Sequence, residues 1–329
     1  MLHRYDGVFH EKGLLTMKWI VGLSVIVAIA MGWAATAVIP AAPVSVDGAS
    51  FKFLPPETDG VAFIDVAALK QAPLFQDIVK DKELSLPRDL AEFSAATGFD
   101  PTRDIDKVTV GKVSPNEGLV IAQGRIDKFK IEQYLRDKGK VPEVYLGQTL
   151  YRDDNGAFLI LDNIALVGPA STVKRAIDQM QLPGSLPLRS DLMDAIRTIE
   201  AGNQVWGVGS FSANDLRTVG VRGPAPVVEM LKSLSNGTYQ MRIDTDLHAR
   251  AIGNFTDAES AKNLADLARG ALAVAKLQVA QRQPDLIQAL DGVQVGNSGA
   301  TLTVTVEESG DLLKKLQTNV KPALEKNLQ

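Results

Sequence analysis

The stretch KVTVGKVSPNEGLVIAQGRID, residues 107–127, contains the junction that decides the fold. Two runs rich in β-branched residues, Lys107–Val113 and Gly118–Gly124, flank a Ser-Pro-Asn-Glu sequence that is typical of a hairpin turn. Asp127 then stands where an N-cap belongs, before the helical pattern of Lys128–Lys138. A hairpin followed directly by a helix favours an antiparallel sheet with helices packed on one face over a doubly wound parallel sheet.

The rest of the first half continues this alternation. Strands are predicted for Val61–Asp65, Glu143–Arg152, Ala157–Asp162 and Ile164–Gly168, and helices for Val66–Lys80, Leu86–Thr97 and a segment from a Ser171 cap to Met180. The helical pattern breaks at Pro73, because proline cannot donate to the hydrogen-bond ladder of a helix.

The second half repeats the order of the first. Strands are predicted for Asn203–Ser210, Thr238–Thr245, Leu247–Phe255, Gly292–Gly296 and Ala300–Glu307, with a turn at Asn236-Gly237 and helices at 213–219, 225–235, 257–280, after Pro284 and at 310–328. Asp127 and Asp257 each stand between a strand and a helix, so they should hold equivalent positions. The sequence therefore predicts an α+β fold of two tandem similar lobes, 51–202 and 203–329, that arose by duplication.

An uncharged run, Trp19–Val38, precedes these lobes. It is long enough to span a membrane, since a bilayer core about 30 Å thick needs roughly 20 apolar helical residues. Lys12 and Lys18 lie on its N-terminal side, so the positive-inside rule predicts a cytoplasmic head, 1–18, and an extracytoplasmic body after the linker 39–50.

Two interpretations of this segment stay open. Its length favours a retained single-pass anchor in the inner membrane, whereas Ala35-Thr36-Ala37 fits a signal-peptidase site and favours secretion after cleavage near Ala37. Met17 is also a more natural start than Met1, because a short basic region would then lead directly into the apolar run. Both interpretations place the body in the periplasm.

Composition excludes several kinds of chemistry. The chain has no cysteine, which excludes thiol nucleophiles, Cys-ligated zinc and iron–sulfur clusters. A net charge of −4, with acidic and basic residues interspersed, provides no basic stripe for nucleic-acid phosphates. The sequence also contains no Walker-type phosphate loop and no nucleophile elbow. It therefore predicts no catalytic, cofactor-binding or metal-binding residue.

Three polar features could have either a functional or a structural role. Asp100, Thr102, Asp104 and Asp106 alternate like the oxygen ligands of a calcium loop. The turn glycine and bidentate glutamate of such a loop are missing from the sequence, so a capping loop is favoured. Asp65 ends an apolar run at a helix start and is predicted to cap that helix, a catalytic or ligand role being the alternative.

His248 is the only histidine after the membrane segment, and the sequence shows no partner for it. It lies in an alternating stretch, which predicts a strand residue that faces solvent.

Two apolar features are weighed in the same way. Gly207-Val208-Gly209-Ser210 follows a strand as a nucleotide-binding turn would, but it lacks the third glycine, so the glycines are interpreted as points of close packing. One face of the helix at 257–280 has helical spacing and is predicted to pack in the core, the alternative being a groove for a partner helix or acyl chain. That face comprises Leu264, Leu267, Ala268, Ala271, Leu272 and Ala275.

Four short motifs carry a resemblance: FLPPET at 53–58, VAFID at 61–65, TGFDP at 97–101 and DID at 104–106. With them, the chain resembles uncharacterised bacterial envelope proteins that have an N-terminal signal or anchor and duplicated α+β domains. The resemblance implies an envelope location and brings no catalytic residues with it.

The leading functional hypothesis is therefore a non-catalytic envelope protein that binds a protein, peptide or apolar ligand. The alternatives are a carboxylate-dependent hydrolase and a carrier of an apolar ligand. A cleft with two carboxylates of shifted pKa would favour the hydrolase, and a broad apolar groove between the lobes would favour binding.

Overall fold

The computed structural model describes residues 48–80, 88–114, 117–154, 156–182, 188–211, 225–279 and 284–317. The predicted membrane segment, Trp19–Val38, and the predicted helix at 213–219 lie outside these ranges. Within them, every helix is either too short or too polar to cross a bilayer.

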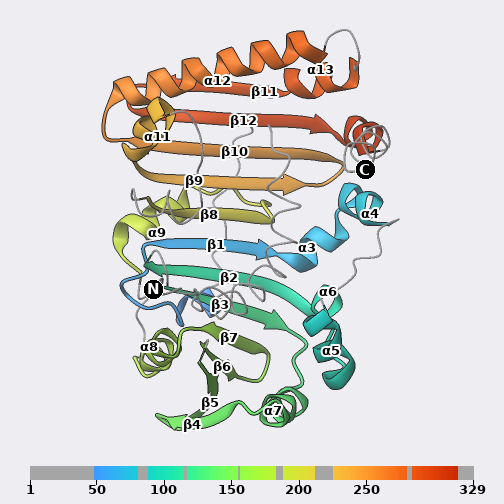
Figure 1. The fold of residues 1–329 in the computed structure, drawn as a ribbon, viewed down its shortest axis with the longest axis vertical. Helices are drawn as coiled ribbons and strands as arrows, with labels where there is room; N and C mark the ends of the chain where they lie inside the picture. Colours follow the sequence, from blue (N-terminus) through green and yellow to red (C-terminus); the bar gives the residue numbers. More distant parts are fainter. Residues whose placement is uncertain are drawn as a thin grey trace, which may run out of the picture.

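The strands of the described chain form one antiparallel sheet of twelve, in the order β11-β12-β10-β9-β8-β1-β2-β3-β7-β6-β5-β4 (Figure 1). The first half supplies β1 (Gly60–Asp65), β2 (Ile105–Ser114), β3 (Glu117–Gly124), β4 (Val141–Tyr145), β5 (Gln148–Asp153), β6 (Gly156–Ile160) and β7 (Ile164–Gly168). The second half supplies β8 (Val205–Ser210), β9 (Leu234–Ile243), β10 (Asp246–Phe255), β11 (Val293–Ser298) and β12 (Thr301–Ser309). The predicted α+β class with antiparallel pairing is confirmed.

The two halves meet at the centre of this sheet, where β1 pairs with β8 and Phe63 lies opposite Trp206. The predicted lobes therefore share one continuous sheet, and strands from both sides of the 202/203 boundary pack in the same cores. The division into 51–202 and 203–329 stays a prediction.

Both halves nevertheless place their strands in the same order. From the centre outward the first half runs β1-β2-β3-β7-β6 and the second runs β8-β9-β10-β12-β11. In each, a helix follows the third strand: α7 (Lys128–Asp137) or α12 (Ala258–Val279). Asp127 and Asp257 accept hydrogen bonds from the backbone N–H groups of Lys130 and Ser260, so both are the N-caps that the sequence predicts. The hairpin β4-β5 is extra in the first half.

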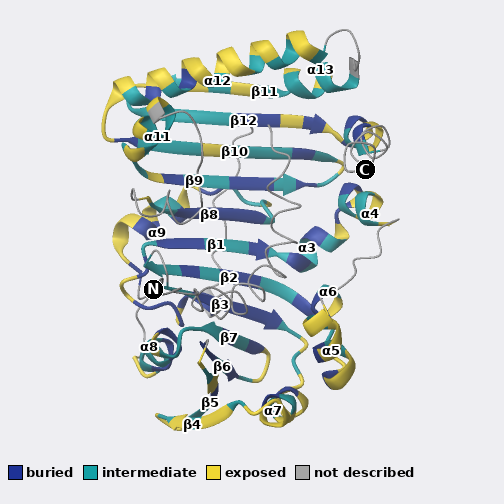
Figure 2. Cartoon of the chain, in the orientation of Figure 1, coloured by how far each residue is buried: buried dark blue, intermediate teal, exposed yellow. Residues whose placement is uncertain are grey.

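Helices cover both faces of the sheet, so the prediction of helices on one face is wrong. We call the side of Phe63 and Trp206 the α9 face, and the opposite side, with Ile64 and Tyr239, the α12 face. On the α9 face lie α2 (Gly48–Phe51), α8 (Ala170–Met180) and α9 (Ser190–Arg197). On the α12 face lie α3 (Val66–Gln71), α4 (Pro73–Val79), α5 (Arg88–Thr97), α7 and α12. Central strands such as β3 are apolar on both faces and need cover on both, which Figure 2 shows as a dark band of buried residues.

Four local predictions are also corrected. The predicted strand Glu143–Arg152 is two strands, because Leu146 and Gly147 both have positive φ and reverse the chain. The helix predicted to begin at a Ser171 cap begins after Pro169 without a side-chain cap. Asn236-Gly237 lies inside β9 instead of forming a turn, and α9 was not predicted. Three further short helices are α6 (Pro101–Asp104), α11 (Ala225–Lys232) and α13 (Pro284–Asp291). Residues 310–317 are helical as well, and the rest of the helix predicted for 310–328 lies outside the described residues.

Candidate functional site

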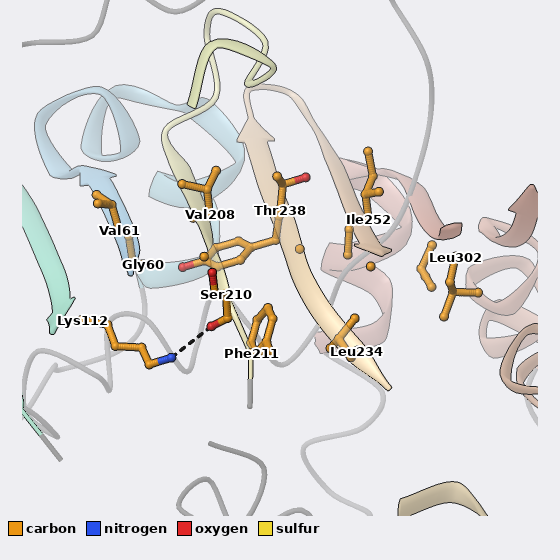
Figure 3. Close-up of a pocket in the computed structure, with 18 of the residues that line it drawn as sticks. Gly60, Val61, Lys112, Val208, Ser210, Phe211, Leu234, Thr238, Ile252 and Leu302 are labelled. Carbon is orange, nitrogen blue, oxygen red and sulfur yellow. Dashed lines mark hydrogen bonds between the residues drawn. The ribbon is translucent and has the colours of Figure 1, made fainter. Parts of the chain in front are cut away.

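A cavity of about 400 Å³ opens on the α12 face, over β1, β8, β9 and β10 and beside α11 and α12 (Figure 3). Its walls are almost wholly apolar: Ala62, Val110, Phe211, Leu231, Leu234, Tyr239, Ala251, Phe255, Leu264, Leu302 and Val304. Val208 and Thr238 point to the other side of the strands from Phe211 and Leu234 (Figure 3). The cavity contains residues from both halves of the chain, so it crosses the predicted boundary between the lobes.

The floor of this cavity is a row of glycines that are direct cross-strand neighbours. Gly60 lies opposite Gly209, Gly209 opposite Gly237, and Gly237 opposite Gly253. The row therefore crosses four strands without a Cβ and forms a trench perpendicular to them. We call this feature the glycine trench. The Phe211 ring lies over Gly237 in this trench, and the Leu234 and Phe255 side chains lie over Gly253.

Lys112 on β2 and Leu302 on β12 are the next residues in register at its two ends. Five inter-strand spacings of about 4.8 Å separate these positions, so the trench is roughly 24 Å long.

Two glycines of the trench, Gly209 and Gly237, are required by close backbone approach. A Cβ on Gly209 would lie 2.9 Å from the Cα of Gly60, and a Cβ on Gly237 would lie 2.7 Å from the carbonyl oxygen of Ile252. Even alanine would therefore push the strands apart, and the trench is built into the backbone of the sheet.

Tyr239 forms one wall of the trench by lying flat over Gly207, where a Cβ would overlap its ring. Burial raises the pKa of the Tyr239 hydroxyl above its ordinary value, so this phenol stays neutral. The hydroxyl has no hydrogen-bond partner among the described residues. The glycine pattern at 207–210 is thus a packing device, as the sequence indicates. The residues after Phe211, where a phosphate-binding helix would have to begin, lie outside the described ranges.

A charged side chain lies at one end of the cavity. Among the described lining residues Lys112 is the only charged one. Its Nζ donates a 3.0 Å hydrogen bond to the carbonyl oxygen of Ser210 and lies 3.4 Å from the Asp59 carboxylate. The opposite end, at Leu302, Val304 and Leu264, is apolar. The cavity therefore has a polar end on β2 and an apolar end beneath α12.

The acidic residues singled out in the sequence lie elsewhere and act structurally. Asp65 caps α3 by accepting a 2.8 Å hydrogen bond from the Ala68 N–H, as predicted. Asp100 caps α6, and the buried Asp104 binds the guanidinium groups of Arg103 and Arg125. The hydrogen bonds from Arg103 hold the pKa of Asp104 well below its usual range, despite the burial of this carboxylate. This arrangement is the capping loop that was favoured over a calcium loop.

His248 does have acidic neighbours, contrary to the sequence interpretation. Its Nδ1 lies 3.9 Å from the Glu307 carboxylate across the β10-β12 pair, and Asp244 and Asp246 contribute ligand-type atoms within 4.8 Å. Both aspartates already accept backbone hydrogen bonds, from the N–H groups of Asp246 and Gly310. Asp244, Asp246 and His248 therefore occur together because they lie at the β9-β10 turn, in which the two aspartates bind backbone N–H groups.

The apolar face of α12 is only partly as predicted. Leu264 lines the cavity, and Ala261 and Ala265 are buried. Leu267, which was predicted to pack, is 47% exposed, and Ala271 is exposed as well. The helix contacts the sheet along a narrow stripe of small residues, so the cavity was not evident from its sequence.

No protein-family model matches the sequence, and no curated protein matches it either. Two crystal structures of TP0453, a Treponema envelope lipoprotein, align with most of the chain. Form I aligns with a TM-score of 0.45 and 12% identity over 83% of this chain and 96% of TP0453. Form IV gives 0.44 and 12% over 84% and 96%. At these TM-scores the likeness carries no argument about function, which rests on the residues of this chain.

Proposed function

We propose that this chain is a non-catalytic envelope protein that binds an apolar ligand in the glycine trench. The observation that carries the proposal is the cavity itself. It falls within the range of about 300–1,000 Å³ that is typical of ligand sites, and its lining is apolar with few polar groups. Gly60, Gly209, Gly237 and Gly253 provide its floor, and the side chains around it, among them Phe211, Leu234 and Phe255, leave this space unfilled. A packed core contains few voids of this size.

The lining of the cavity supports binding over hydrolysis, because it contains no carboxyl among the described residues. A carboxylate-dependent hydrolase needs two carboxyls in one cleft, with pKa values that their environments push apart. Among the described carboxyls with a resolved shift, Glu308 alone has a raised pKa, and it does not line the cavity. The Asp59 carboxylate, at the Lys112 end of the trench, is paired with Lys112.

The proposed location follows from the sequence. Trp19–Val38 would hold the chain in the inner membrane or direct its export, which would place the trench in the periplasm. An apolar ligand that must cross an aqueous compartment needs a binding site that shields it from water.

The repeated strand order supports an ancestral duplication. The pairings β1-β2-β3-β7-β6 and β8-β9-β10-β12-β11, with Asp127 and Asp257 as equivalent caps, follow from copying one unit. The trench would then have formed where the two copies joined.

Binding of Nile red, a neutral apolar dye, tests the proposed function on the full chain. Wild type should bind the dye saturably, with a blue-shifted emission. Ala251→Phe should abolish most of this binding, because Ala251 is exposed within the trench and a phenyl ring there fills it without displacing the backbone. Ala273→Phe, at an exposed alanine of α12 that does not line the cavity, is the matched control and should bind as wild type does. Equal binding by all three proteins would contradict the proposal.

A further inference from the structure

We propose that the ligand is a single-chain amphiphile with an anionic head, such as a long-chain fatty acid. The head would lie at Lys112 and the acyl chain along the glycine trench toward Leu302. This inference rests on the proposed function and specifies its ligand class.

The shape of the cavity argues for one chain. The residues that line it extend from Lys112 on β2 to Leu302 on β12, roughly 24 Å over five strand spacings. Its volume of about 400 Å³ lies near the lower end of the range for ligand sites, about 300–1,000 Å³. A cavity of this length and small volume suits one extended acyl chain better than a lipid with two chains or a broad polycyclic ligand.

The placement of polar atoms determines the orientation of the ligand in the cavity. Two polar side-chain ends could meet a head group: the Lys112 ammonium on β2 and the Tyr239 hydroxyl, which reaches from β9 over Gly207 of β8. The β12 end offers Leu302, Val304 and Leu264, which would leave a charged head desolvated and unpaired. A ligand with one charged and one apolar end therefore fits in one direction.

The charge at Lys112 argues for an anion. Asp59 and the Ser210 carbonyl hold this ammonium at the end of the trench, so its position does not have to be fixed on binding. A ligand carboxylate would share the ammonium with Asp59. Removing the Lys112 charge should therefore weaken binding of the anion, and removing the Asp59 charge should strengthen it.

Displacement of Nile red from the full chain by palmitate and by cetyl alcohol, its uncharged counterpart, separates the two claims. Lys112→Met should weaken palmitate binding about tenfold, the loss of one charge-assisted contact, and weaken cetyl alcohol binding much less. Lys112→Arg should retain palmitate binding, and Asp59→Asn should strengthen it severalfold by removing a like charge. Binding of cetyl alcohol shows that each variant is folded.

Each outcome has a defined meaning. If Lys112→Met weakens both ligands equally, or neither, the anionic head is not at Lys112 and this inference is overturned while the apolar site stands. If octanoate binds as tightly as palmitate, the chain does not occupy the trench, since each buried methylene should add affinity. If wild type binds neither palmitate nor cetyl alcohol, the proposed function itself fails.

Discussion

Trp206→Ala is expected to lower the free energy of unfolding by about 4 kcal/mol, the usual cost of removing a large aromatic side chain from a packed core. Trp206 is 1% exposed and is the largest fully buried side chain among the described residues. Its ring stacks on Phe63 with centroids 5.3 Å apart and meets the edge of Phe51 at 6.3 Å. These partners come from the first half of the chain, so the loss should destabilise both halves together.

Chemical denaturation of the full chain, followed by circular dichroism, measures this effect. Trp206→Phe should cost less, because the buried indole N–H has no hydrogen-bond partner in the described part of the chain and only volume is lost. Phe129→Ala, at a side chain that is 70% exposed, is the control and should change little. Two separate transitions, only one of which shifts in Trp206→Ala, would show that the halves fold independently and that the shared core is unimportant.

Glu308→Gln is expected to stabilise the protein at neutral pH, which is the second large effect. Glu308 is 7% exposed on the α12 face of β12, and its buried Oε1 has no partner among the described residues. Desolvation raises the pKa of this carboxyl from 4.5 to about 7. The folded protein therefore keeps this proton where the unfolded chain has lost it.

The direction of the pH dependence of stability follows from proton binding. Because the folded state binds the proton more tightly, stability falls as the pH rises from 4.5 to about 7, and the full deficit is present above that pH. Glutamine carries no charge to desolvate, so the variant should exceed wild type by up to roughly 3 kcal/mol above neutral pH. The difference should vanish in acid, below the ordinary pKa of glutamate.

Melting temperatures across this pH range check the prediction. Glu307→Gln is the matched control, because Glu307 is the next residue but its side chain is 44% exposed beside His248. It should show no comparable gain at neutral pH. If Glu308→Gln follows wild type at every pH, the Glu308 carboxyl is solvated and its assigned environment is wrong.

Local signals in the sequence account for most of the elements. Asp65, Asp127 and Asp257 were predicted as caps because a carboxylate before a helical pattern has one obvious use, and all three are caps. The turn at Leu146-Gly147 was missed because leucine rarely adopts positive φ, so the sequence carried no turn signal there.

Long-range features could not be read in the same way. The pairing of β1 with β8 joins segments more than a hundred residues apart. No local sequence pattern indicates that the strands of the two halves form one sheet. The glycine trench depends on that pairing and on the register of β9 and β10. Gly60, Gly209, Gly237 and Gly253 look like unrelated strand glycines until the register brings them into one row.

The most direct test of the central claim is a crystal structure of the protein with palmitate brominated at its terminal carbon. The anomalous signal of bromine reports the position of the chain end independently of any interpretation of weak density. We expect a bromine peak within the glycine trench, near Leu302 and Leu264. A trench closed by side chains, or bromine bound only at sites outside it, would contradict the claim that this protein binds an apolar ligand there.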